Sequence, residues 1–75
     1  MNNLKKKTLL LKAQIEFGSE YEYEIKNGGL GMTLVIDADT KEKAGIIRKK
    51  APTDWEGLYV MVIYRSTGEK LGEES

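Results

Sequence analysis

The sequence predicts an α+β fold in which one helix packs on one face of a four-stranded mixed sheet, in the order β-β-β-α-β. Three observations support this prediction. Two alternating apolar and polar stretches flank the dipeptide Asn27-Gly28, a third alternating stretch precedes them, and a capped amphipathic segment is followed by an apolar run. Alternation with period two indicates strands, and an apolar stripe of period 3.6 indicates a helix. We therefore expect a β-meander followed by a helix and a crossover strand.

The length and composition limit what this fold can contain. The 75 residues form a single domain, residues 1–75, whose ends at 1–6 and 69–75 we expect to fray. The chain has no cysteine and no histidine, which removes disulfides, the usual transition-metal ligands and the commonest general base. We therefore expect no enzyme, no catalytic residue, no cofactor and no metal. No run approaches the roughly 20 apolar residues of a membrane span, so we expect no membrane association and a cytoplasmic location.

The first predicted strand covers residues 7–17, where apolar residues recur at every second position. One face of this strand would carry Leu9, Leu11, Ala13, Ile15 and Phe17. A three-residue loop, Gly18-Ser19-Glu20, would join it to the second strand and would place Glu16 opposite Glu22. We interpret the glutamate face as solvated, because surface charges contribute little energy. The alternative is a weak divalent-cation site or a landing surface for a basic partner.

The second and third strands form a hairpin whose turn is Asn27-Gly28, because the central residues of such a turn need positive φ. This turn sets Ile25 opposite Leu30. One face of the hairpin is then apolar and the other is acidic, with Tyr21, Tyr23 and Ile25 on the first and Glu20, Glu22 and Glu24 on the second.

A helix follows the third strand and ends before Pro52, which restricts the residue ahead of it. Asp39 is the expected N-cap, with Glu42 reaching back to complete a capping box. The apolar stripe of this helix consists of Ala44, Ile46, Ile47 and Ala51.

The last strand, residues 58–64, is apolar on both faces, which is typical of a central or doubly covered strand. A strand–helix–strand unit implies a parallel neighbour, and the sequence leaves open whether this is the first or the third strand. If Leu58 and its even-numbered neighbours face the helix, then Tyr59, Met61 and Ile63 lie on the opposite face. Val35 lies beside them if the third strand is the neighbour.

One helix covers only one face of a sheet, so this opposite face predicts an exposed apolar patch of the kind that marks an interface. The predicted partner interface consists of Val35, Tyr59, Met61, Ile63 and Trp55. Trp55 has two interpretations. It plugs one end of the core, which its size favours, or it anchors a partner.

We therefore expect a non-catalytic protein–protein interaction module, or a small regulator or inhibitor, that forms a homodimer through the outward face of the last strand. The alternative is a nucleic-acid-associated protein that uses a basic patch made of Lys5, Lys6, Lys7, Arg48, Lys49, Lys50 and Arg65. Twelve basic and twelve acidic side chains balance to zero net charge, which makes the nucleic-acid alternative the weaker one.

Overall fold

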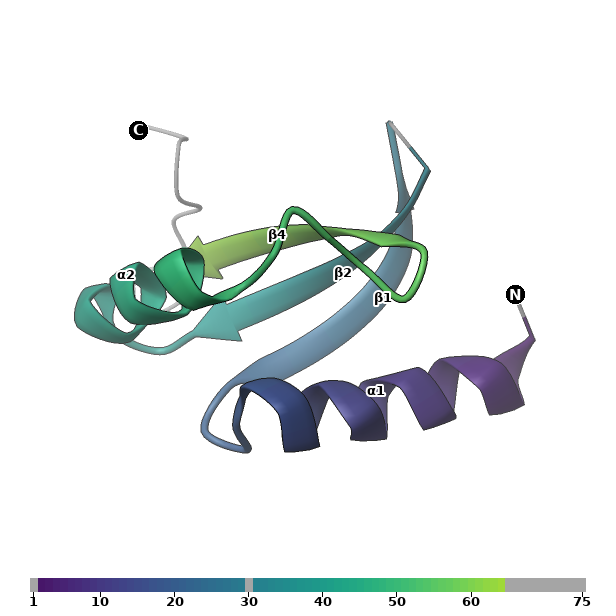
Figure 1. Cartoon of the computed structure of the whole chain (residues 1–75), viewed down its shortest axis with the longest axis horizontal. Helices are drawn as coiled ribbons and strands as arrows, with labels where there is room; N and C mark the ends of the chain where they lie inside the picture. The colour runs from purple at the N-terminus through teal and green to yellow at the C-terminus, as the bar shows by residue number, and fades with distance from the viewer. Residues whose placement is uncertain (1, 30, 65–75) are drawn as a thin grey trace.

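The computed structural model describes residues 2–29 and 31–64 of the chain. Both helices contribute buried side chains to one core that lies against one face of a four-stranded sheet (Figure 1). The elements in chain order are α1 (Asn3–Phe17), β1 (Glu22–Gly28), β2 (Gly31–Ala38), α2 (Lys41–Lys50), β3 (Asp54–Trp55) and β4 (Leu58–Tyr64). The strand order is β1-β2-β4-β3, with β2 and β4 parallel and the other neighbours antiparallel. The predicted α+β class and mixed sheet are confirmed.

The predicted first strand is wrong, because residues 3–17 form helix α1. The helix begins at the N-cap Asn2, whose side chain accepts the Lys5 N–H at 2.8 Å. Residues 3–6, which we expected to fray, form its first turn. The buried positions Leu9, Ala13 and Phe17 recur every fourth residue, a spacing that suits a helix as well as a strand. Strong helix formers such as leucine, lysine, alanine and glutamine dominate this segment, and they decide between the two periods.

The hairpin of β1 and β2 is present, but its predicted turn is wrong by two residues. The pair nearest the turn is Gly28 with Gly31, and Ile25 faces Leu34 instead of Leu30. Gly31 has φ +128°, a conformation that glycine adopts at little cost. The outward shift lengthens the ladder and places Ile25 against a fully buried leucine, a larger gain than the local turn preference.

The helix α2 lies where it was predicted, with a different cap. Thr40, and not Asp39, is the N-cap, and its hydroxyl accepts the Lys43 N–H at 3.1 Å. Asp39 instead forms an ion pair with the Lys43 ammonium at 3.4 Å. Thr40 has the extended backbone of an N-cap, with φ −134° and ψ 155°, so the helix starts one residue later than the capping-box pattern indicated.

The neighbour of β4 and the identity of the fourth strand were not predicted from the sequence. The parallel neighbour of β4 is β2, the third of the strands that we predicted. Because α1 replaces the first predicted strand, the fourth strand is β3, which has only two residues and pairs with the start of β4. Within residues 2–29 and 31–64, the fold therefore has four strands, as predicted, and two helices instead of the single predicted helix.

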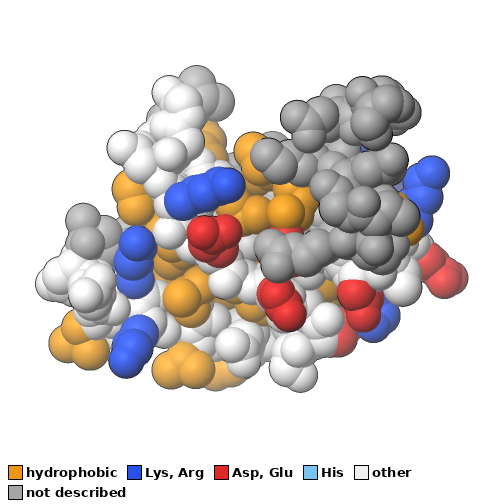
Figure 2. Space-filling view, turned by 180° about the vertical axis from the view of Figure 1, so that it is seen from behind, with side chains coloured by type: hydrophobic (Ala, Val, Ile, Leu, Met, Phe, Trp, Pro, Cys, Tyr) orange, Lys and Arg blue, Asp and Glu red, His pale blue; other side chains and the backbone are white. Residues whose placement is uncertain are grey.

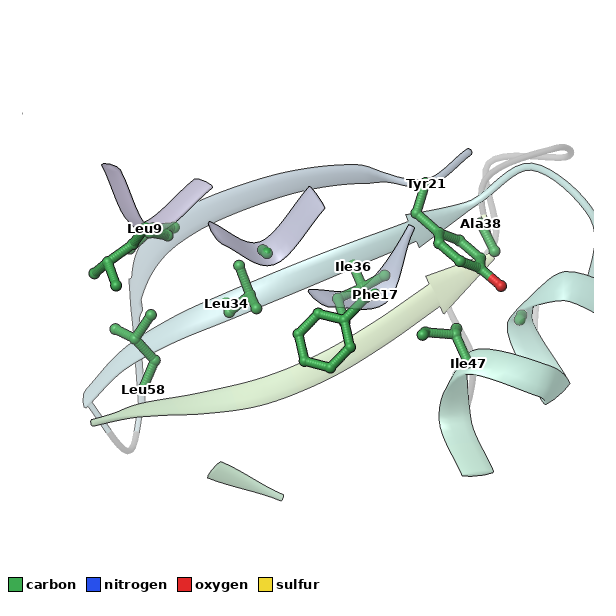
Figure 3. Close-up of a cluster of buried hydrophobic side chains, with 11 residues drawn as sticks. Leu9, Phe17, Tyr21, Leu34, Ile36, Ala38, Ile47 and Leu58 are labelled. Atoms are coloured by element: carbon green, nitrogen blue, oxygen red, sulfur yellow. The ribbon is translucent and has the colours of Figure 1, made fainter. Parts of the chain in front are cut away.

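The hydrophobic core lies between the helices and one face of the sheet (Figure 3). In Figure 3, Phe17 and Ile47 point from α1 and α2 toward the sheet, in which β2 carries Leu34 and Ile36. The fully buried members of this core come from three elements and include Leu34, Ile36, Ala38, Ala13, Ala44 and Ile47. Alanines at two helix positions allow the helix backbones to approach the sheet closely.

Tyr23 lies at the border of this core, and its hydroxyl donates a hydrogen bond to the Gly18 carbonyl oxygen. Burial, then the nearby Glu20 carboxylate and Tyr21, raise the pKa of Tyr23 from 10.0 to about 12. Between these pH values the native state retains a proton that the unfolded chain loses, so the free energy of unfolding should fall as the pH rises from 10 toward 12. Urea unfolding at several alkaline pH values should show this fall.

Tyr23→Phe removes the ionisable hydroxyl and should flatten the pH dependence, although it also removes the hydrogen bond to Gly18. The control is Tyr59→Phe, which changes a half-exposed tyrosine on the opposite face of the sheet. The prediction would be contradicted if the free energy of unfolding fell as steeply with rising alkaline pH in Tyr23→Phe as in the native sequence.

Candidate interaction surface

We call the face of the sheet opposite the two helices the outer face. It consists of Thr33, Val35 and Asp37 on β2 and of Tyr59, Met61 and Ile63 on β4. The parallel register pairs Thr33 with Tyr59, Val35 with Met61, and Asp37 with Ile63. Val35 therefore lies beside Met61, as expected if the third predicted strand is the neighbour of the last. The even-numbered residues of β4 point to the helix side, where Leu58 is buried and Val60, Val62 and Tyr64 are partly buried.

The outer face is exposed mainly along β4. Tyr59 and Met61 are each 47% exposed, whereas Val35 on the central strand is only 1% exposed. Ile63 is half-buried. Val35 thus forms the floor of the surface, and Tyr59 and Met61 are the apolar side chains that a partner can cover.

The ring of Tyr59 lies against the end of the β1–β2 hairpin. A Cβ atom added at Gly31 would lie 3.6 Å from the Cε2 atom of Tyr59, so the ring covers the glycine backbone at van der Waals distance. The neighbouring Thr33 hydroxyl donates to the Gly31 carbonyl oxygen at 3.1 Å. The absence of a side chain at Gly31 therefore leaves room for the Tyr59 ring at this end of the outer face.

Shallow hollows flank the exposed side chains of β4. One of them, the edge groove, has a volume of about 360 Å³ and is lined by Arg48, residues 51–53 and residues 60–62. A second hollow of about 260 Å³ lies between the hairpin end, Tyr59 and Met61. Pockets for small molecules usually enclose about 300–1,000 Å³, so the edge groove lies at the lower end of this range and the second hollow lies below it.

Charged side chains border the outer face on the side of β1. Glu24 pairs with Val35 and Glu22 pairs with Asp37 across the ladder, so both carboxylates point to this face. Figure 2, which shows the molecule from behind, displays acidic side chains beside apolar ones in the middle of this side. The apolar strip therefore has a polar border on the β1 side, and polar rims of this kind are typical of interfaces between folded proteins.

Trp55 lies apart from the other predicted interface residues. It pairs with Leu58 on β4, on the side of the sheet that the helices cover. Its ring contacts Phe17, with ring centroids 5.5 Å apart and an interplanar angle of 60°. This geometry is that of a favourable tilted aromatic pair, and it supports the interpretation of Trp55 as a plug for the core.

The basic residues form two separate groups. Lys5, Lys6 and Lys7 lie near the start of α1, and Arg48, Lys49 and Lys50 form the last turn of α2. The start of α1 and the helix α2 lie at opposite ends of the molecule (Figure 1). Arg65 lies outside the described residues. Among the described residues, the two groups therefore form no continuous surface for a nucleic-acid backbone.

The expected cluster of Glu16, Glu22 and Glu24 is not formed, because Glu16 lies in α1 and not in a strand beside β1. Within residues 2–29 and 31–64, no group of three acidic side chains could hold a metal ion.

The sequence reasoning also missed two surface features. One is the edge groove, which is lined by β4 and by residues 51–53 between α2 and β3. The other is the apolar stripe Leu4, Leu11 and Ile15 on the outer side of α1. Reading residues 3–17 with helical periodicity would have found this stripe.

The described helices include none that is long and apolar enough to cross a membrane. No family model, curated protein or solved structure matches this chain.

Proposed function

We propose that this chain is a non-catalytic protein-interaction module that forms a homodimer through the outer face of β4. The observation that supports this most strongly is the exposure of Tyr59 and Met61, at 47% each, beside the buried Val35. Large apolar side chains that gather around a buried aliphatic residue mark a binding surface more often than isolated exposed ones do.

A second copy of the chain suits this surface because the apolar strip is narrow and its charged residues lie to one side. In a contact with two-fold symmetry, the same strip on each copy covers the other. With β4 near the symmetry axis, Glu22 and Glu24 of β1 lie toward the rim, where their carboxylates stay hydrated. Tyrosine and methionine are also among the residues enriched in such contacts.

The proposed role follows from this arrangement. A dimer would present two copies of every other surface and would act by bridging or occluding another protein. A role as a regulator or inhibitor is part of this proposal, and so is a cytoplasmic location.

The test is the solution mass of the native sequence and of Met61→Lys at micromolar concentration, by sedimentation equilibrium. We expect the native chain to have the mass of two copies and Met61→Lys the mass of one, because the substitution places a charge in the apolar contact. The far-ultraviolet circular dichroism of both should be the same, since Met61 lies outside the helix-covered core.

The matched control is Ile46→Lys. Ile46 is 57% exposed on α2, so the substitution adds the same charge at another exposed apolar position, on the helix side of the sheet. It should leave the mass of two copies unchanged. A single-copy mass for the native chain, or dissociation by Ile46→Lys as complete as by Met61→Lys, would refute the proposed interface.

A further inference from the structure

We propose that the outer side of α1 docks against an acidic amphipathic helix of a partner protein, and that the two helices pair as in a short coiled coil. This inference deepens the proposed function and rests on it, since it names the kind of partner that the interaction module takes. It concerns α1, which lies on the helix side of the sheet, whereas the homodimer uses the outer face (Figure 1). The two proposals can therefore be tested separately.

The first argument is the apolar stripe of α1, which consists of Leu4, Leu11 and Ile15. These side chains are 74%, 61% and 86% exposed, more than any other large apolar side chain among the described residues. With Thr8 between the two leucines, the positions 4, 8, 11 and 15 are spaced by four, three and four residues. At about 3.6 residues per turn, this spacing places them in a strip about 60° wide, opposite the residues that α1 buries in the core.

The width of this strip indicates what covers it. A helix that packs on a broad apolar surface presents a stripe about 100° wide or more, whereas a spacing that alternates between four and three residues is the narrower seam of a coiled coil. Leu4 and Leu11 occupy the d positions of such a seam, and Ile15 occupies an a position, a combination that suits the pairing of two helices. The same width argues against a lipid surface, into which a helix inserts a large apolar face.

Thr8, at the other a position of the seam, can be covered without losing a hydrogen bond. Its hydroxyl donates to the Leu4 carbonyl oxygen at 3.0 Å, within the helix. A buried hydroxyl without a partner would oppose docking, and this bond removes that penalty. Thr8 therefore fits the seam as a small side chain whose polar atom is already satisfied.

The charges beside the stripe select an acidic partner. Lys5 and Lys12 border the stripe on one side and Lys7 borders it on the other, and all three are exposed. Lys12 forms an ion pair with Glu56 but stays half-exposed, and within the described residues Lys5 and Lys7 form no ion pair. The acidic residue of α1, Glu16, lies in its last turn. The stripe thus has a basic border on both sides.

Charges at such bordering positions decide which helices pair. A second copy of α1 would set lysine against lysine in either direction, Lys7 against Lys12 if parallel and Lys5 against Lys12 if antiparallel. Like charges oppose such pairing, whereas glutamates at the bordering positions of another helix would meet opposite charges on both sides. The occupant that these charges favour is therefore an acidic helix of another protein.

The helix α1 is already formed before such a partner binds. Leu9, Ala13 and Phe17 hold it in the core, and the Asn2 side chain caps its first turn. Only the partner then loses chain entropy on forming its helix. Because the seam covers only two heptads, we expect a dissociation constant of roughly 1–100 µM.

The experiment uses the full chain and a fluorescein-labelled peptide of about three heptads, with binding followed by fluorescence anisotropy. This glutamate probe has leucine at positions a and d and glutamate at positions e and g, and its own like charges oppose self-pairing. Two altered probes are compared with it, one with lysine in place of glutamate and one with a proline in the middle that breaks the helix. We expect each to bind at least about tenfold more weakly, because one loses charge complementarity and the other loses the helix.

A matched pair of substitutions tests the stripe. Ile15→Ala should weaken the glutamate probe about tenfold, because it removes apolar surface from the seam. Ile46→Ala makes the same change at an exposed position of α2 and should weaken the probe less than about twofold. Both isoleucines lie outside the core, so the circular dichroism spectra should match that of the native chain.

A second pair tests the charge. Lys7→Glu should weaken the glutamate probe about fivefold, because it sets like charges beside the seam. Lys41→Glu makes the same change in net charge in the first turn of α2 and should weaken the probe less than about twofold.

The inference is overturned if the glutamate probe does not bind, if the proline probe binds equally well, or if the two members of either pair have equal effects. Sedimentation of the native chain with vesicles of phosphatidylserine and phosphatidylcholine, abolished by Ile15→Ala, would assign the stripe to a lipid surface instead. A fall in the solution mass on Ile15→Ala would assign it to a second copy.

The solution mass of the native chain is measured on the same samples. Met61→Lys should bind the glutamate probe as the native chain does, because Met61 lies on the outer face of the sheet. Probe binding by a native chain of single-copy mass would refute the homodimer alone, and a dimer that does not bind the probe would refute the helix partner alone.

Discussion

Phe17→Ala is expected to lower the free energy of unfolding by about 3–4 kcal/mol, the usual cost of emptying a buried phenylalanine site. Phe17 is only 5% exposed, lies at the end of α1, and contacts the ring of Trp55. The substitution removes apolar surface from the core and also the partner of the tilted aromatic pair. A domain of this length has a total stability of roughly 4–11 kcal/mol, so the loss is a large part of the whole.

Trp55 is the single tryptophan of the chain, so its fluorescence reports on this contact directly. Urea unfolding followed by tryptophan emission and by circular dichroism measures the loss. In the native state of Phe17→Ala, the emission should shift to longer wavelength, because the half-buried indole loses the ring that covers it.

Ile15→Ala is the control for Phe17→Ala, and it also separates the two interpretations of this segment. Ile15 is 86% exposed, and its replacement should change the stability by less than about 0.5 kcal/mol. In the strand that the alternation predicted, Ile15 and Phe17 share one buried face, and both replacements would be costly. Equal losses from the two substitutions would therefore contradict helix α1.

The second large effect is expected for Ile47→Ala, which should lower the free energy of unfolding by about 3 kcal/mol. Ile47 has no exposed surface and points from α2 toward the sheet (Figure 3). Ile47 belongs to the same core as the fully buried Leu34 and Ile36 of β2. Because β2 is buried on both faces, its side chains cannot move to fill the cavity that the substitution leaves. Urea unfolding at neutral pH measures the loss.

Ile46→Ala is the matched control, with the same chemical change at the next residue of the same helix. Ile46 is 57% exposed, so its replacement removes little buried surface, and alanine is the better helix former. Its effect should lie within about 0.5 kcal/mol of zero. If Ile46→Ala and Ile47→Ala lowered the free energy of unfolding by comparable amounts, α2 would pack on the sheet through a broader face than the structure shows.

The pattern of the sheet faces was predictable even where the register was not. In the observed pairing, each residue of β1 faces a residue of β2 that lies four positions later in the chain than predicted. Ile25, for example, faces Leu34 instead of Leu30. An even shift leaves every side chain on its predicted face, because side chains alternate with period two. The outward position of Tyr59, Met61 and Ile63 was predictable for the same reason.

The segment before β1 shows where the one-dimensional pattern fails. Leu9, Ala13 and Phe17 are spaced four apart, and this spacing belongs to both periods, so the apolar pattern alone does not distinguish them. Helix propensity and the cap at Asn2 are the local signals that favour the helix. Leu11 and Ile15, which are exposed in the helix and strengthened the alternation, led to the wrong period.

Amino-acid order alone was sufficient for the α+β class, for helix α2 and for the two faces of the strands, because these depend on periodicities and caps within a few residues. Packing in three dimensions decided the register of the β1–β2 hairpin, the choice of β2 as the neighbour of β4 and the edge groove. Each of these depends on contacts between residues far apart in the chain. Such contacts bury enough apolar surface to outweigh local preferences of about 1 kcal/mol.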